Sequence, residues 1–203
     1  MNAITQATMF KQNGGPVSIS SVLIPMDQLK QETIDAIRNA AVLAAVNKAF
    51  ELWGRGQTLT VRDINGTDMG YANNIFTETA IAAAGWAAMA CGAFTVPTAT
   101  VIAIYGIAIG WQLNAAVPLP ITGIRIDVGG SRQAQWNVQC LSQWATGAVV
   151  APLVPRAGVT RSPIVAAEDI TVTPYENSRG VATVYEPYWL GVAVEKEGVT
   201  LKP

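Results

Sequence analysis

The 203-residue sequence contains no histidine. Histidine is the commonest general base in enzymes and the commonest transition-metal ligand, so most catalytic and metal sites are excluded. A Ser-His-Asp triad cannot form. The remaining acidic candidates are Glu168, Asp169 and Glu186, and no sequence feature places them in one cleft. We therefore predict that the chain is not an enzyme and has no catalytic, cofactor-binding or metal-binding residues.

Cysteine is almost absent as well. Cys91 and Cys140 are the only two, and without further Cys or His they cannot make a zinc site. Both lie in apolar surroundings, and the sequence leaves open whether they pair as a disulfide or remain buried free thiols. Residues 63–68 (DINGTD) resemble the start of a calcium-binding loop. Position twelve of such a loop would be Asn74, where a Glu belongs, so we do not predict calcium.

Charge is scarce too. Charged residues make up 13% of the chain, about half the usual share, and the net charge is −1. A weakly charged, apolar surface tends to associate, so we expect contacts with other copies and other proteins. A compact domain with a large core is the alternative. The N-terminus has no basic segment followed by an apolar core, so we predict no signal peptide and synthesis in the cytoplasm.

Basic and aromatic residues are not grouped along the sequence. The arginines outside the first third are scattered, at Arg125, Arg132, Arg156, Arg161 and Arg179. No basic stripe with aromatic residues is visible, so we predict no specific nucleic-acid partner. The tryptophans lie in apolar or alternating segments, and we assign four of them to the core: Trp53, Trp86, Trp136 and Trp189.

The most conspicuous stretch, residues 79–124, has no charged side chain at all. Residues 81–111 are long enough to span a membrane. However, Pro97 and several glycines interrupt them, and residues 100–111 are rich in β-branched and aromatic types. No Lys or Arg cluster flanks either end to set an orientation in a bilayer. We predict a strand buried on both faces, with a membrane span or membrane contact as the alternative.

The first quarter of the chain predicts an arm and a helix. Residues 1–16 are polar and end in Gly and Pro, which indicates a flexible arm. Residues 17–24 predict a short strand. Residues 27–53 predict a long amphipathic helix that Asp27 caps and Gly54 ends. Its expected buried face is marked by larger apolar residues: Leu43, Val46, Phe50 and Trp53, after Ile34, Ile37 and Ala41.

The rest of the chain, residues 57–203, predicts a β-sandwich. Alternation indicates strands at 57–64, 123–128 and 133–140, the last two forming a hairpin around Gly129 and Gly130. Residues 77–81 favour a strand more weakly. Residues 146–163 predict a proline-rich loop, residues 169–173 a strand and residues 174–180 a turn. Residues 181–194 predict a strand pair or one bent strand, with Pro187 at an edge or a bulge.

Four segments together resemble small jelly-roll virion proteins of phages and related viruses. They are residues 59–63 (LTVRD), 101–106 (VIAIYG), 122–130 (TGIRIDVGG) and 188–195 (YWLGVAVE). The resemblance implies a mainly β, jelly-roll-like sandwich that forms or decorates a capsid. It implies location in the virion after synthesis in the host cytoplasm, and partners that are copies of the chain and other virion proteins. The long helix departs from a minimal jelly roll. A pore-forming protein and a ligand-binding β-sandwich are the other hypotheses.

Overall fold

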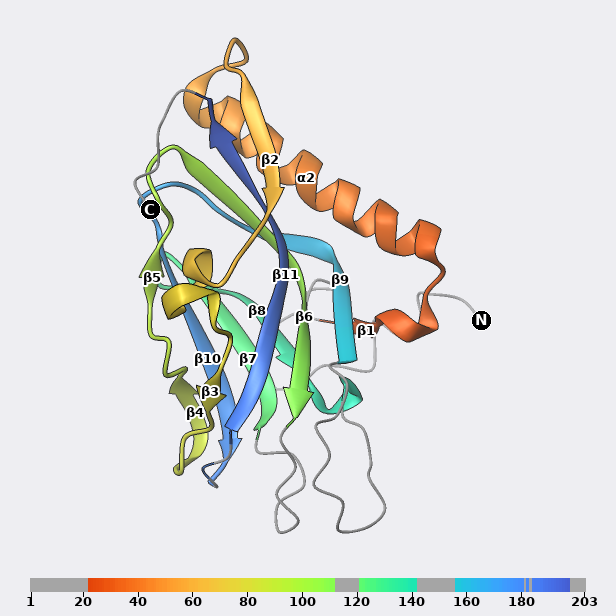
Figure 1. Cartoon of the computed structure of the whole chain (residues 1–203), viewed down its shortest axis with the longest axis vertical. Coiled ribbons are helices and arrows are strands. Elements are labelled where there is room, and N and C mark those ends of the chain that lie inside the picture. Colours follow the sequence, from red (N-terminus) through yellow and green to blue (C-terminus); the bar gives the residue numbers. More distant parts are fainter. Residues whose placement is uncertain (1–21, 112–120, 142–155, 181, 183, 198–203) are drawn as a thin grey trace.

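The computed structural model describes residues 22–111, 121–141, 156–180, 182 and 184–197. The chain is mainly β, as predicted, with two antiparallel sheets and one long helix. Helix α2 (Gln31–Trp53) lies along one face of the first sheet, sheet A, and the second sheet, sheet B, lies on the other side (Figure 1). The expected arm, residues 1–16, and residues 17–21 of the expected first strand lie outside the described residues.

Sheet A has six strands, in the order β1-β9-β6-β11-β2 with β3 beside β11. Their bounds are β1 Ile24–Pro25, β2 Leu59–Asp63, β3 Glu78–Thr79, β6 Thr100–Trp111, β9 Arg156–Ala166 and β11 Val184–Lys196. The strand predicted at 57–64 is confirmed as β2. The last strand is one long strand that pairs with β6 and has a register shift at Leu190/Gly191.

Sheet B has five strands, in the order β4-β10-β7-β8 with β5 beside β10. Their bounds are β4 Ala84–Ala88, β5 Phe94–Thr95, β7 Ile121–Val128, β8 Ser131–Asn137 and β10 Thr171–Arg179. The predicted hairpin is confirmed, because β7 pairs with β8 across a turn in which Gly129 and Gly130 both have positive φ. Short 3-10 turns complete the described elements: η2 Met26–Gln28, η3 Thr67–Met69, η4 Ala72–Asn74 and η5 Gln139–Leu141.

Strand β6 is buried on both faces, as its uncharged sequence predicts. On one side Ile102, Ile104, Ile107 and Ile109 belong to the core between the sheets. The other side belongs to a second core under α2 and includes Tyr105. The isoleucines at 104 and 107 share a face because the register with both neighbouring strands shifts at Tyr105, where a β-bulge adds one residue. In the described part of the chain no helix is long and apolar enough to cross a membrane.

The predicted helix exists, but its start was wrong and its buried face was predicted only in part. Ile37 and Ala41 are buried as predicted, and Val46 and Trp53 are partly buried against the same core. The helix begins at Gln31 with Lys30 at the N-cap position, and Asp27 instead pairs with Arg156 at 2.6 Å. The fully buried row is Ile37, Ala41, Ala45 and Ala49, which let the helix approach sheet A closely. Leu43, expected in the core, lies about 200° around the helix from Ala41 and is 60% exposed. The helix ends as predicted at Gly54, which has positive φ.

Two segments expected to be irregular are strands. Residues 156–163 of the predicted loop belong to β9; Pro163 fits because residues 160–163 bulge out of the ladder with β6 and need no N–H there. Residues 174–179 of the predicted turn are instead the second half of β10, whose side chains alternate in burial. Pro187 lies where β11 pairs with β6 but with neither β3 nor β2, so the predicted edge is present locally.

Candidate functional site

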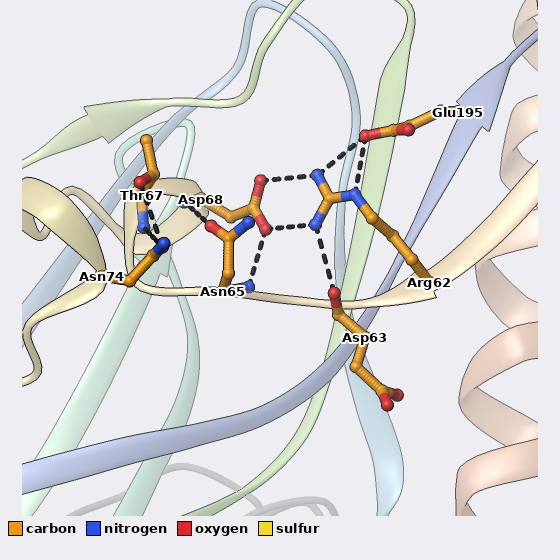
Figure 2. Close-up of polar contacts among 7 residues, drawn as sticks. All are labelled: Arg62, Asp63, Asn65, Thr67, Asp68, Asn74 and Glu195. Carbon is orange, nitrogen blue, oxygen red and sulfur yellow. Dashed lines mark hydrogen bonds and ion pairs between the residues drawn. The ribbon is translucent and has the colours of Figure 1, made fainter. Parts of the chain in front are cut away.

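A cluster of polar residues surrounds Arg62 at the edge of sheet A (Figure 2). The guanidinium forms a two-pronged ion pair with Asp68, at 2.6 and 2.9 Å, and a second ion pair with Glu195 of β11 at 2.7 Å. Asp68 is 6% exposed. Its carboxylate also accepts a hydrogen bond from the backbone N–H of Asn65, whose side chain accepts one from the N–H of Asp68. The cluster ties β2, β11 and the following loop together.

This arrangement bears on the calcium-like segment at residues 63–68. The carboxylate that could have served as a metal ligand is held by the guanidinium of Arg62, so a protein cation takes the place of an ion. Asn74, at the position where such a loop needs a Glu, accepts hydrogen bonds from the N–H and hydroxyl of Thr67. The Arg62 cluster thus fixes the loop that follows β2.

Two carboxyl groups enter the space between the sheets. Glu176 comes from β10 and is 0% exposed, and Glu78 comes from β3 and is 2% exposed. Glu176 accepts hydrogen bonds of 2.5 Å from the hydroxyl of Tyr185 and from the N–H of Ile81. One oxygen of Glu78 accepts a hydrogen bond from the N–H of Cys91, and the other has no partner among the described residues.

Burial is the main cause of the pKa shifts of Glu176 and Cys91. It raises the pKa of Glu176, and the nearby charge of Glu78 adds to the shift, while the hydrogen bonds from Tyr185 and Ile81 oppose it. Burial also raises the pKa of the Cys91 thiol to about 12, so this cysteine is not a reactive thiolate at neutral pH. The fully buried position of Glu176 closes it to substrates.

Glu176 should make stability fall as pH rises. Its pKa lies above the ordinary 4.5, so the folded chain holds this proton more tightly than the unfolded chain does. The contribution is complete below pH 4.5 and is lost as pH increases through the raised pKa. Glu176→Gln cannot ionise and should flatten this part of the profile in urea denaturation. Glu32→Gln, exposed on α2, should keep the wild-type slope. The same slope in Glu176→Gln and wild type would contradict this account.

A third cluster lies on the outer face of sheet B. The guanidinium carbon of Arg125 on β7 is 3.9 Å from the ring centroid of Tyr175 on β10 and 5.6 Å from that of Trp86 on β4. Its Nε lies 3.1 Å from a carboxylate oxygen of Asp127. An Arg held between two aromatic rings gains cation–π stabilisation and loses little freedom on binding a ligand.

Trp86 is the most exposed member of this cluster, at 37%. Its indole lies against the backbone of β7 at Gly123, where an added Cβ would be 3.0 Å from the ring. The indole therefore contacts the sheet at Gly123 and Arg125 and is otherwise partly exposed to solvent. The core assignment of Trp86 was wrong, whereas Trp136 and Trp189 are buried as predicted and Trp53 is half-buried.

The acidic candidates from the sequence are not brought together. Glu168 accepts hydrogen bonds from Trp53 Nε1 and from the N–H of Ala99, next to the start of β6. Glu186 is paired in register with Gly110, near the other end of the same strand. Cys91 and Cys140 are both free, the first half-buried and the second exposed. Within the described residues no group of His, Cys, Asp and Glu is placed to hold a metal ion.

The sequence missed both Glu176 and the Arg125 cluster. The segment around Glu176 looked like a turn because its inward positions carry Pro174, Glu176 and Ser178. The signal that could have predicted a strand is the alternation of inward and outward positions, which continues through these polar residues. The Arg125 cluster has no local signal, because its members come from three strands joined only by register.

No protein-family model matches the sequence, and no curated protein matches it.

Proposed function

We propose that this chain is a non-enzymatic structural protein of a virus particle, which assembles with copies of itself as a capsid subunit or decorates a capsid. It is made in the host cytoplasm and located in the virion. The proposal includes a jelly-roll topology for the two sheets. The nested pairing of the strands is the observation that carries it.

The longer strands pair like the two arms of one long hairpin. Apart from the short β1, β3 and β5, the pairs are β2 with β11, β4 with β10, β6 with β9 and β7 with β8. The first strand thus pairs with the last, the second with the second to last, and so on inward. Rolling such a hairpin gives two four-stranded sheets, which supports a jelly roll. Jelly rolls are common in viral capsid proteins and lectins and also occur in cupins.

Composition favours the assembly role among these. The sequence has no histidine and a net charge of only −1. The charged residues of α2 all come before residue 39 or after residue 47, and between them the side that faces away from sheet A exposes Ala40 and Leu43. A helix with apolar residues on both sides is expected where a second surface covers it. We therefore expect this side of α2 to be a contact between subunits.

Light scattering on a sizing column, without detergent and over a range of concentrations, tests the proposal. Wild-type protein should form discrete multimers of the 21.4 kDa chain. Leu43→Lys should shift these to smaller species, because burying an exposed leucine contributes about 1–2 kcal/mol per contact, roughly a tenfold change in association.

The control is Ile75→Lys, which changes an equally exposed apolar residue (59%) away from α2. It should leave the multimers intact. Wild-type protein that stays monomeric at every concentration would contradict the assembly role. Equal effects of the two variants would retain assembly and reject α2 as the contact.

A further inference from the structure

The outer face of sheet B brings together three arginines that are far apart in the sequence. Outward positions of its strands hold Arg125, Arg132 and Arg179, and Asp127 is the one acidic residue at such positions. Glu176, also on β10, points inward. Three of the five arginines that look scattered in the sequence therefore share one face, in a chain whose net charge is −1. An anionic partner fits this distribution of charge.

The arginines and the aromatic rings follow one diagonal across the sheet. Arg132 is paired with Asp127, which is paired with Thr173, and Arg179 lies six residues farther along β10. Strand rise and strand spacing put the Cα atoms of Arg132 and Arg179 about 22 Å apart. Trp86 and Arg125 lie between them. This span suits three or four nucleotides of an extended single strand.

We propose that the outer face of sheet B binds single-stranded nucleic acid without sequence preference. Trp86 stacks a base on the exposed part of its indole, and Arg132 and Arg179 contact phosphates on either side. Arg125, which contacts Tyr175 and Trp86 and pairs with Asp127, is a positioning residue that holds the indole in place. The inference goes beyond the proposed assembly role and does not depend on it, because one subunit contains the whole surface.

Nucleic acid fits better than another polyanion because the face combines an exposed ring with flanking arginines. Stacking on an aromatic ring is independent of base identity, because every base has a π-face. Phosphate contacts from Arg132 and Arg179 also carry no sequence information. An acidic polysaccharide would share the charge contacts, and the experiment separates the two.

The test measures binding of the full-length chain by fluorescence anisotropy at low salt. The probes are a labelled oligothymidylate of about 12 nucleotides, an abasic strand of the same length and a heparin fragment. The oligothymidylate should bind at least about fivefold tighter than the abasic strand, because only the former can stack. Raising the salt from about 50 to 200 mM should weaken binding about sevenfold if two phosphates are contacted.

Variants separate the contribution of base stacking from that of the phosphate contacts. Trp86→Ala should remove the preference for bases, and Trp86→Phe should restore part of it. Arg132→Ala/Arg179→Ala should weaken both strands and flatten the salt dependence. The matched control, Arg55→Ala/Arg161→Ala, removes two exposed arginines elsewhere and should change neither. Thermal unfolding checks that each variant is folded.

Several results would overturn the proposal. Equal binding of the oligothymidylate and the abasic strand would mean that no base stacks. Equal losses in the two arginine double variants would mean that only net charge matters. Absence of binding at low salt would reject the site. Heparin binding that depends on Trp86, without binding of the oligothymidylate, would assign the face to an acidic polysaccharide. None of these outcomes bears on whether the chain assembles.

Discussion

Replacing Arg62 by methionine should lower the free energy of unfolding by about 3–5 kcal/mol. The substitution keeps most of the apolar stem and removes the charge. Asp68, which is 6% exposed, would then be left without its ion-pair partner, and Glu195 would lose its contact as well. Removing the cation lowers the free energy of unfolding by more than the ion pair contributed. The carboxylate is still desolvated on folding, and no partner then compensates its charge.

The structure offers a matched control for this prediction. Arg38 pairs with Asp63 at 2.8 Å, a distance similar to those around Arg62, but the two side chains are 43% and 68% exposed. Arg38→Met should change the free energy of unfolding by less than about 1 kcal/mol, because water compensates both charges. Chemical denaturation of the two variants measures the difference. If both lose the same amount, burial of Asp68 is not the cause.

The parts of the fold that the sequence predicts well are those where burial is uniform. Strand β6 carries no charge because one face meets sheet B and the other meets α2. The hairpin of β7 and β8 alternates cleanly because its outer face is open, and Gly129 and Gly130 mark its turn. In both cases the local sequence pattern already indicates which side chains are buried.

The sequence fails where the environment comes from distant residues. The buried face predicted for helix α2 missed Ala45 and Ala49, which let the helix approach sheet A closely, and it included Leu43, which is exposed. Glu176 looked like part of a turn because no neighbouring residue in the sequence indicates that Tyr185 is its hydrogen-bond partner. Arg125 and Trp86 meet only through the register of β4, β10 and β7.

The two proposals together give the subunit two different sides. The middle of the solvent side of α2, residues 39–47, carries no charge and exposes Leu43, which suits contact with other copies. The outer face of sheet B lies on the opposite side of the sandwich (Figure 1). It carries three arginines and the partly exposed indole of Trp86.

Gly106→Ala should lower the free energy of unfolding by about 2–3 kcal/mol, because it disturbs the bulge that divides β6 between its two cores. An added Cβ at Gly106 would lie 2.4 Å from the carbonyl oxygen of Gly158 on β9. That oxygen belongs to backbone and cannot rotate away as a side chain would, so β6 and β9 must separate at the centre of sheet A.

The control for this substitution is Gly56→Ala, which meets nothing within 4 Å and should be close to neutral. Urea denaturation of both variants gives the comparison. A small effect at Gly106 would mean that β9 moves freely against β6. The bulge would then not be what places Ile107 and Ile109 in the same core as Ile102 and Ile104. A large effect would mean that both cores depend on the close approach of β6 and β9 at Gly106. Without the bulge, Ile107 and Ile109 would point away from sheet B.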